Sequence, residues 1–210
     1  MNKIRNLSIA LSLIAFAPAA FAQDNQDTSD KRFAVVGGYA VQKNESRPID
    51  NSGLSFDGGS AATLSASWYA TPQFAVELWG AADKFEQRVR SDAAGKLGNI
   101  DSQPVALSAQ YHFGQSDATI RPFVGLGYYQ TNYSGGNNIR NAADEHFGLE
   151  DAKGAVGTVG VDFNISPSWF ARADARYMHG SSDVTFNGEG AGAEADMNPW
   201  VVGLGVGARF

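Results

Sequence analysis

Residues 198–210, NPWVVGLGVGARF, alternate between two kinds of side chain. One face is apolar throughout and runs from Trp200 to Phe210, whereas the other carries mainly glycine and Arg209. This period of two predicts a β-strand. The two aromatic residues would lie about 25 Å apart along the axis of a barrel whose strands tilt by roughly 40°. That distance matches the lipid-facing band of a transmembrane β-barrel, and the last strand of a soluble β-sandwich is the alternative.

The start of the chain has the order of a secretory signal peptide. A basic beginning, an apolar run at residues 7–16 and the small-x-small sequence AFA at residues 20–22 follow one another. A retained transmembrane helix is the alternative, but the apolar run is too short for one. We therefore expect residues 1–22 to be cleaved and to lie unattached to the fold. Residues 23–31 would form a short periplasmic lead, and residues 32–210 a single domain.

Composition narrows the functional class of the mature chain. Without the signal peptide, 14 basic residues face 22 acidic ones, a net charge of −8, which argues against nucleic acid as a partner. No cysteine is available for disulfides. No later run approaches the roughly 18 apolar residues of a spanning helix, so a chain that crosses a membrane must do so as a closed barrel.

Eight stretches alternate as residues 198–210 do, and most have about the 9–11 residues of a tilted membrane strand. They predict an all-β fold, an eight-stranded antiparallel up-and-down transmembrane β-barrel, with strands at residues 32–42, 62–70, 74–83, 105–113, 121–131, 155–164, 169–181 and 199–210. Short turns alternate with long polar connections at residues 43–61, 84–104, 132–154 and 182–198. Short periplasmic turns and long external loops are typical of outer-membrane barrels, and this pattern predicts that both termini are periplasmic.

Charged residues indicate which face of a strand points inward. Arg172, Asp174 and Arg176 share one face, and because an arginine facing lipid costs about 2–4 kcal/mol, that face must point into the barrel. The same reasoning places Glu77 and Asp162 inside. The other expected inward residues are Thr63, Ser65, Ser67, Trp79, Ala106, Ser108, Gln110, His112, Thr158 and Gly160.

Two strands are not oriented by this argument. Residues 32–42 and 121–131 carry apolar residues and glycine on both faces. Eight strands enclose an interior just wide enough for side chains or one small ligand. The sequence therefore does not predict a wide aqueous pore.

An ordered set of segments resembles one family of small outer-membrane proteins. The segments are PVALSAQYHFG (104–114), RPFVGLGYYQTNY (121–133), GAVGTVGVDF (154–163), ARYM (175–178) and the terminal NPWVVGLGVGARF. Together with the signal peptide they resemble the OmpW family of eight-stranded barrels, over most of the mature chain.

The resemblance implies a monomeric barrel in the outer membrane of a Gram-negative bacterium, with a narrow, partly apolar lumen. It implies that small hydrophobic molecules enter the lumen and leave sideways into the lipid. It also implies that the assembly machinery of the outer membrane recognises the terminal Phe210. The family offers no catalytic residues to carry over, so no enzyme activity and no cofactor is expected.

The inward-facing polar residues allow two interpretations. They can form a gate in the lumen, or they can form a salt-bridge network that fills a small barrel, since buried charges need partners on neighbouring strands. Such a network would also obstruct ions. The gate candidates are Glu77, Trp79, Gln110, His112, Asp162, Arg172, Asp174, Arg176 and Arg209.

Other motifs carry less weight. The histidines 112, 146 and 179 have no second His or Cys at ligand spacing, which predicts no metal site. His179 and Ser181 face lipid near the outer rim, where a lipid A hydrolase would place such a pair, with Glu189 or Glu194 to orient the histidine. A strand that ends in a Gly-Ser loop explains the same residues more simply.

We therefore expect a narrow passive channel or binding pocket for small hydrophobic molecules, in contact with the lipid bilayer and lipopolysaccharide. A surface structural or adhesion barrel with functional external loops is the first alternative. A lipid A-modifying hydrolase that uses His179 and Ser181 is a remote one.

Overall fold

The computed structural model describes residues 31–44, 54–91, 95–134, 147–149, 151–186, 189–196 and 198–210. The expected signal peptide and nearly all of the expected periplasmic lead lie outside these residues. No helix within the described ranges is long and apolar enough to span a membrane.

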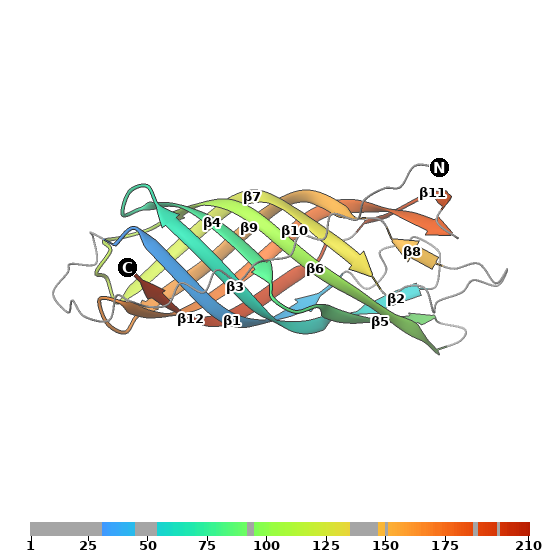
Figure 1. Cartoon of the computed structure of the whole chain (residues 1–210), viewed down its shortest axis with the longest axis horizontal. Coiled ribbons are helices and arrows are strands. Elements are labelled where there is room, and N and C mark those ends of the chain that lie inside the picture. The colour runs from blue at the N-terminus through green and yellow to red at the C-terminus, as the bar shows by residue number, and fades with distance from the viewer. Residues whose placement is uncertain are drawn as a thin grey trace, which may run out of the picture.

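Eight long strands form a closed antiparallel barrel, which confirms the predicted fold class (Figure 1). Each strand pairs with the next one of the eight along the chain, and the last pairs with the first in a register from Ala34↔Arg209 to Lys43↔Trp200. The strands are β1 (Phe33–Lys43), β3 (Gly59–Tyr69), β4 (Phe74–Ala81), β6 (Gly95–His112), β7 (Ile120–Ser134), β9 (Ala152–Asn164), β10 (Trp169–Phe186) and β12 (Trp200–Arg209).

The closing seam extends to the last residue of the chain. The backbone N–H of Phe33 donates to the carbonyl of Phe210 at 3.0 Å, and the N–H of Phe210 donates to the carbonyl of Phe33 at 2.9 Å. Their rings stack outside the barrel with centroids 6.2 Å apart. Closure satisfies the backbone groups of both strands, which an open edge in lipid could not do.

The barrel wall continues into segments that the sequence pattern assigned to loops. Four short strands belong to the same sheet: β2 (Leu54–Asp57), β5 (Phe85–Ser91), β8 (Phe147–Leu149) and β11 (Glu189–Asp196). β6 begins ten residues before its predicted start, at Gly95, and β10 ends at Phe186. The prediction of loops throughout 43–61, 84–104, 132–154 and 182–198 is therefore wrong, because strands beyond the apolar outer band can face water on one side and need no apolar outer face.

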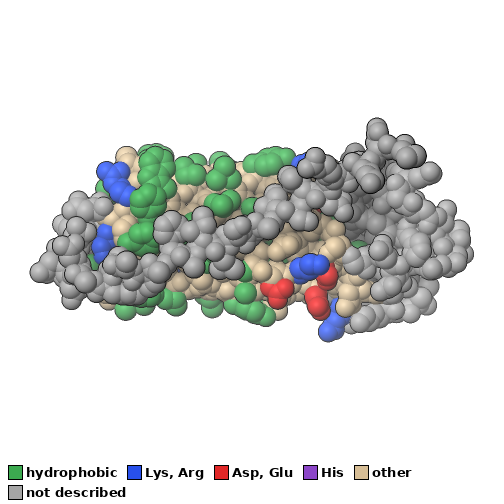
Figure 2. Space-filling view, in the orientation of Figure 1, with side chains coloured by type: hydrophobic (Ala, Val, Ile, Leu, Met, Phe, Trp, Pro, Cys, Tyr) green, Lys and Arg blue, Asp and Glu red, His purple; other side chains and the backbone are tan. Residues whose placement is uncertain are grey.

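The outer face of the spanning strands is apolar, as predicted. Leu126 is 74% exposed and Leu204 is 69% exposed, and large hydrophobic side chains on each of the eight long strands share this outward position. Figure 2 shows hydrophobic side chains spread along the wall, with acidic ones gathered toward the end at which β5 lies and basic ones near both ends. An apolar band of this kind fits lipid.

The structure also orients the two strands that the sequence left undecided. β1 turns Ala34, Val36, Ala40 and Gln42 inward. β7 turns Arg121, Phe123, Tyr129 and Thr131, together with two glycines, toward the lumen. Both strands thus supply lumen side chains that the sequence argument did not predict.

Short connections join strands at the end of the barrel where the C-terminus lies (Figure 1). The hydroxyl oxygen of Thr71 accepts a hydrogen bond from the N–H of Phe74 at 3.0 Å, and that of Ser166 accepts one from Trp169 at 3.1 Å. After β6 the chain turns at Gly114, whose φ of 78° favours glycine. Local turn chemistry therefore explains why these connections are tight.

Aromatic rings cover glycines on the inner wall and yield a stability prediction. Phe170 pairs with Gly207 across β10 and β12, and a methyl group at Gly207 would overlap the Phe170 ring. We expect Gly207→Ala to lower the free energy of unfolding by about 1–3 kcal/mol, because the ring cannot move within a filled lumen. Urea unfolding in lipid vesicles, followed by tryptophan fluorescence, measures this change.

Gly203 on the same strand is the matched control. A methyl group there would lie 3.5 Å from both the Ala40 methyl and an Asp174 carboxylate oxygen, which is ordinary contact. Gly203→Ala should therefore leave the unfolding midpoint unchanged or raise it slightly. Equal losses in the two variants would contradict the explanation by ring overlap.

Candidate functional site

A network of buried charges occupies the lumen at its centre. Arg172 on β10 donates to Asp162 on β9 through Nε at 2.7 Å and Nη2 at 3.0 Å. Its remaining nitrogen, Nη1, donates to Oε2 of Glu77 on β4 at 2.6 Å. All three side chains are almost completely buried. Arg172 therefore joins two carboxylates from strands on different sides of the barrel.

Two further arginines complete the ion pairs. Nη2 of Arg209 on β12 lies 2.8 Å from Oδ2 of Asp162. Arg176, four residues further along β10, lies 2.9 Å from Glu77 through Nη1 and 3.0 Å from Asp174 through Nε. Among the described residues, the lumen carboxylates of Glu77, Asp162 and Asp174 thus each have at least one guanidinium partner, as buried charges require.

Gln110 and His112 on β6 line the same network. Nε2 of Gln110 donates to Oε1 of Glu77 at 2.8 Å, and Oε1 of Gln110 lies 3.2 Å from Nε2 of His112. The His112 ring stacks on Phe123 with centroids 4.9 Å apart, and its Nδ1 lies 3.8 Å from Asp162. The Gln110 amide and the His112 ring therefore fill the lumen beside the ion pairs.

Aromatic faces cover the guanidinium groups. The Arg172 guanidinium carbon lies 4.6 Å from the centroid of Phe123, and that of Arg209 lies 4.0 Å from Phe170. Arg176 lies 4.6 Å from the centroid of Trp79, the gate candidate with an indole ring. These cation–π contacts add attraction where water is excluded, and Trp79 connects the charges to an apolar region.

Little free space remains beside the network. The cavity bordered by Arg172, Asp174, Arg176, Trp79 and the β1 and β12 wall has a volume of about 10 Å³. That is room for about one water molecule. At this level the side chains fill the lumen rather than leave a pore.

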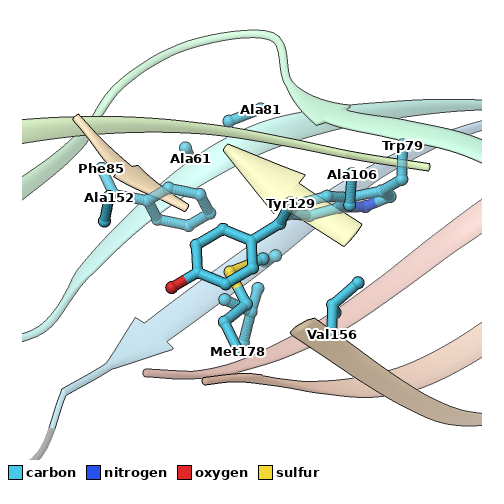
Figure 3. Packing of buried hydrophobic residues seen from close by; sticks show 11 residues of the cluster. Ala61, Trp79, Ala81, Phe85, Ala106, Tyr129, Ala152, Val156 and Met178 are labelled. Carbon is cyan, nitrogen blue, oxygen red and sulfur yellow. The ribbon is translucent and has the colours of Figure 1, made fainter. Parts of the chain in front are cut away.

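An apolar cluster adjoins the charged network on the side toward β5. Trp79, Phe85, Tyr129, Val156 and Met178 are buried there against each other and against small residues (Figure 3). The remaining members of this apolar section are Ala40, Ala61, Ala81, Ala106, Ala152 and Val201. The lumen therefore has two chemically distinct parts, one charged and one apolar.

A ring of hydrogen bonds borders the apolar section near Phe85. Gln42 donates to Asn44, Asn44 to Gln87, Gln87 to Ser102 at 2.7 Å, and Ser102 back to Gln42 at 3.2 Å. All four side chains are buried. Their polar atoms are thus largely satisfied by one another.

All nine gate candidates lie on the inner face, as the strand pattern predicted. Eight of them belong to the network of ion pairs and hydrogen bonds, and Trp79 contacts it through Arg176. Phe210 points outward at the rim. The sequence argument missed Arg121, which is buried, donates to the carbonyl of Pro72 and lies 5.9 Å from the centroid of Tyr69.

His179, the histidine of the lipid A hydrolase alternative, contacts an asparagine in the structure. His179 and Ser181 are both exposed on the outer face, as expected. Nδ1 of His179 lies 2.9 Å from Oδ1 of Asn198. The side chains of Glu189 and Glu194, like His146, lie outside the described residues. Within the described part of the chain, no group of three or more His, Asp or Glu side chains could hold a metal ion.

A closed eight-stranded barrel with an apolar outer band and a charged, filled lumen defines a small integral protein of the bacterial outer membrane. The OmpW family model matches residues 33–210, and the chain belongs to the OmpW family. The wall of such a barrel contacts the lipid bilayer and lipopolysaccharide.

Three proteins illustrate the similarity. Outer membrane protein W of Escherichia coli (strain K12) is 32% identical, with all of both chains covered. Outer membrane protein AlkL of Ectopseudomonas oleovorans is 23% identical over 77% of this chain and 71% of its own. The crystal structure of OprG from Pseudomonas aeruginosa has a TM-score of 0.71 at 22% identity, covering 88% of this chain and 99% of OprG, and the similarity is one of fold.

Proposed function

We propose that this protein is a narrow passive channel or binding pocket for small hydrophobic molecules. The observation that supports this proposal most is the apolar section of the lumen, which brings Trp79, Phe85, Tyr129 and Met178 together inside a membrane barrel. Apolar walls with a few polar groups are typical of sites for small molecules. A barrel that served only as a scaffold would have no need of two separate lumen chemistries.

The charged network obstructs the lumen, which favours a solute route that does not continue straight to the periplasm. A molecule on that path would have to separate Arg172 and Arg176 from Glu77, and breaking a buried ion pair costs about 3–5 kcal/mol. An apolar molecule offers no compensating contact. We therefore assign the gate role to the nine candidate residues named above, and we expect apolar molecules to leave sideways through the wall into the lipid.

Two adjacent alanines on β3 allow a direct test by solute uptake. Ala61 belongs to the apolar section, whereas Ala62 is exposed on the outer face. We expect vesicles with the wild-type protein to take up apolar dyes faster than empty vesicles, and Ala61→Trp to abolish this gain by filling the lumen. Circular dichroism first verifies that the variant barrel is folded, because overfilling costs about 1–3 kcal/mol.

Ala62→Trp is the control for the added ring, since tryptophan is well tolerated at the membrane rim. It should leave uptake unchanged. Equal uptake with and without protein for every apolar solute tried would count against transport. Loss of uptake in both variants would show that the lumen is not the route.

We further propose that both termini face the periplasm, that the barrel is monomeric, and that Phe210 is recognised by the assembly machinery of the outer membrane. The short connections at the end of the C-terminus support this orientation. A cysteine introduced at Asp117, in the connection between β6 and β7, should resist labelling by impermeant reagents on intact cells. Rapid labelling there would reverse the orientation.

A further inference from the structure

The hydroxyl group of Tyr129 is a buried polar atom within the apolar section. The residue is 1% exposed, and its hydroxyl has no hydrogen-bond partner among the described residues. The other buried members of the cluster are hydrophobic, and the partly buried Tyr133 packs against them. A buried polar group without a partner is unfavourable, and its presence in a native fold calls for an explanation.

The position of this hydroxyl is built by the neighbouring strands. Tyr129 extends from β7 toward β10, and a Cβ atom at Gly180 would lie 2.6 Å from the hydroxyl oxygen. The missing side chain of Gly180 therefore leaves the space that the hydroxyl occupies. In Figure 3 the hydroxyl points away from Trp79, and thus away from the charged network.

Nearby polar groups do not serve this hydroxyl. The side chains of Gln42, Asn44, Gln87 and Ser102 form hydrogen bonds with one another. The Tyr129 hydroxyl has no hydrogen-bond partner among the described residues, so a ligand that brings its own polar group supplies the missing partner.

We propose that the Tyr129 hydroxyl hydrogen-bonds one polar group of the bound solute. The preferred solutes are then apolar molecules that bear a single hydroxyl or carbonyl group, rather than pure hydrocarbons. This inference rests on the proposed function, because it assigns the solute class of the same lumen site. A neutral hydrogen bond formed in place of an unpaired hydroxyl produces selectivity without charge.

Two ligands of nearly equal shape test the proposal. p-Cresol and p-xylene differ by a hydroxyl in place of a methyl group, and their binding to the full-length barrel in lipid nanodiscs is measured by calorimetry. Tyr129→Phe should weaken p-cresol binding by about three- to tenfold and leave p-xylene binding unchanged. Comparing each ligand with itself between proteins cancels its different partitioning into lipid.

Tyr128→Phe is the control, because Tyr128 is the next residue and lies exposed on the outer face. It should change neither affinity. Without ligand, the urea midpoint of Tyr129→Phe should equal or exceed that of the wild type, since no intramolecular hydrogen bond is lost. A lowered midpoint would show that the protein itself satisfies the hydroxyl, and would overturn the inference.

The outcomes separate this inference from the proposed function. If p-xylene binds and Tyr129→Phe does not weaken p-cresol more than Tyr128→Phe does, the hydroxyl is not a selectivity group and the lumen site stands. If neither ligand binds the wild-type barrel in the lumen, the proposed function fails and the inference fails with it.

Discussion

Replacement of Arg172 by methionine is expected to lower the free energy of unfolding of the barrel by about 3–5 kcal/mol. Arg172 makes three hydrogen bonds of 2.6–3.0 Å to Asp162 and Glu77 and is itself fully buried. Its loss leaves two buried carboxylates with fewer partners, and water cannot reach them to compensate. Urea unfolding in lipid vesicles, followed by tryptophan fluorescence, measures the loss.

A double variant tests whether uncompensated charge is the cause. Adding Glu77→Gln to Arg172→Met leaves Asp162 paired with Arg209 and Asp174 paired with Arg176. The double variant should therefore be more stable than Arg172→Met alone, although it has lost one more charged group. A further loss of stability would show that the individual contacts, rather than charge balance, hold this region together.

An exposed ion pair is the control for Arg172→Met. Nζ of Lys84 lies 3.6 Å from Oδ2 of Asp101, and the Lys84 side chain is 47% exposed. Exposed pairs contribute about 0–1 kcal/mol, so Lys84→Met should have little effect. If the two methionine variants lost the same stability, burial would not be what makes the Arg172 network important.

The same charges explain why so much of the barrel could be predicted from the sequence. Arg172, Asp174 and Arg176 alternate with alanines in mid-strand, where only one face can tolerate charge in lipid. That single constraint orients β10, and period-two alternation then fixes every other residue of the strand. The structure confirms this inward face, and it confirms those derived from Glu77 and Asp162.

Where charge lies at the rim, the constraint weakens. Arg121 is the second residue of β7 and shares its face with Phe123 and Tyr129. Near the interface a lipid-facing arginine costs only about 0–1 kcal/mol, so its charge could not orient the strand. The sequence therefore did not predict that Tyr129 points into the barrel, even though Tyr129 and Arg121 lie on the same face of the strand.

Beyond the apolar outer band, the alternation of side chains no longer includes an apolar outer face. In β5, the buried residues Phe85 and Gln87 alternate with the exposed residues Glu86 and Arg88. The inner face mixes apolar and amide side chains, the amides taking part in the ring of hydrogen bonds, and the outer face is charged rather than apolar. A search for apolar outer faces reads such a strand as a loop, which is why the lumen boundary at Phe85 appeared only in the structure.

Replacement of Leu204 by arginine should destabilise the barrel by about 2–4 kcal/mol if the outer band lies in lipid. Leu204 is 69% exposed and lies near the middle of β12, between Trp200 and Phe210. In a water-soluble barrel the same change would replace an exposed leucine by a hydrated charge and cost almost nothing. The difference in unfolding free energy between wild type and variant, measured in lipid vesicles, therefore reports the surroundings of this face.

Ile165 provides a control of equal exposure. It is also 69% exposed, but it lies in the short connection between β9 and β10 rather than within a strand. Ile165→Arg should cost about 0–1 kcal/mol, because arginine near the interface reaches water and headgroups. A large loss for Leu204→Arg with a small one for Ile165→Arg locates the lipid at the level of Leu204. Equal losses would contradict that location, because exposure alone, and not depth in the bilayer, would then decide the effect.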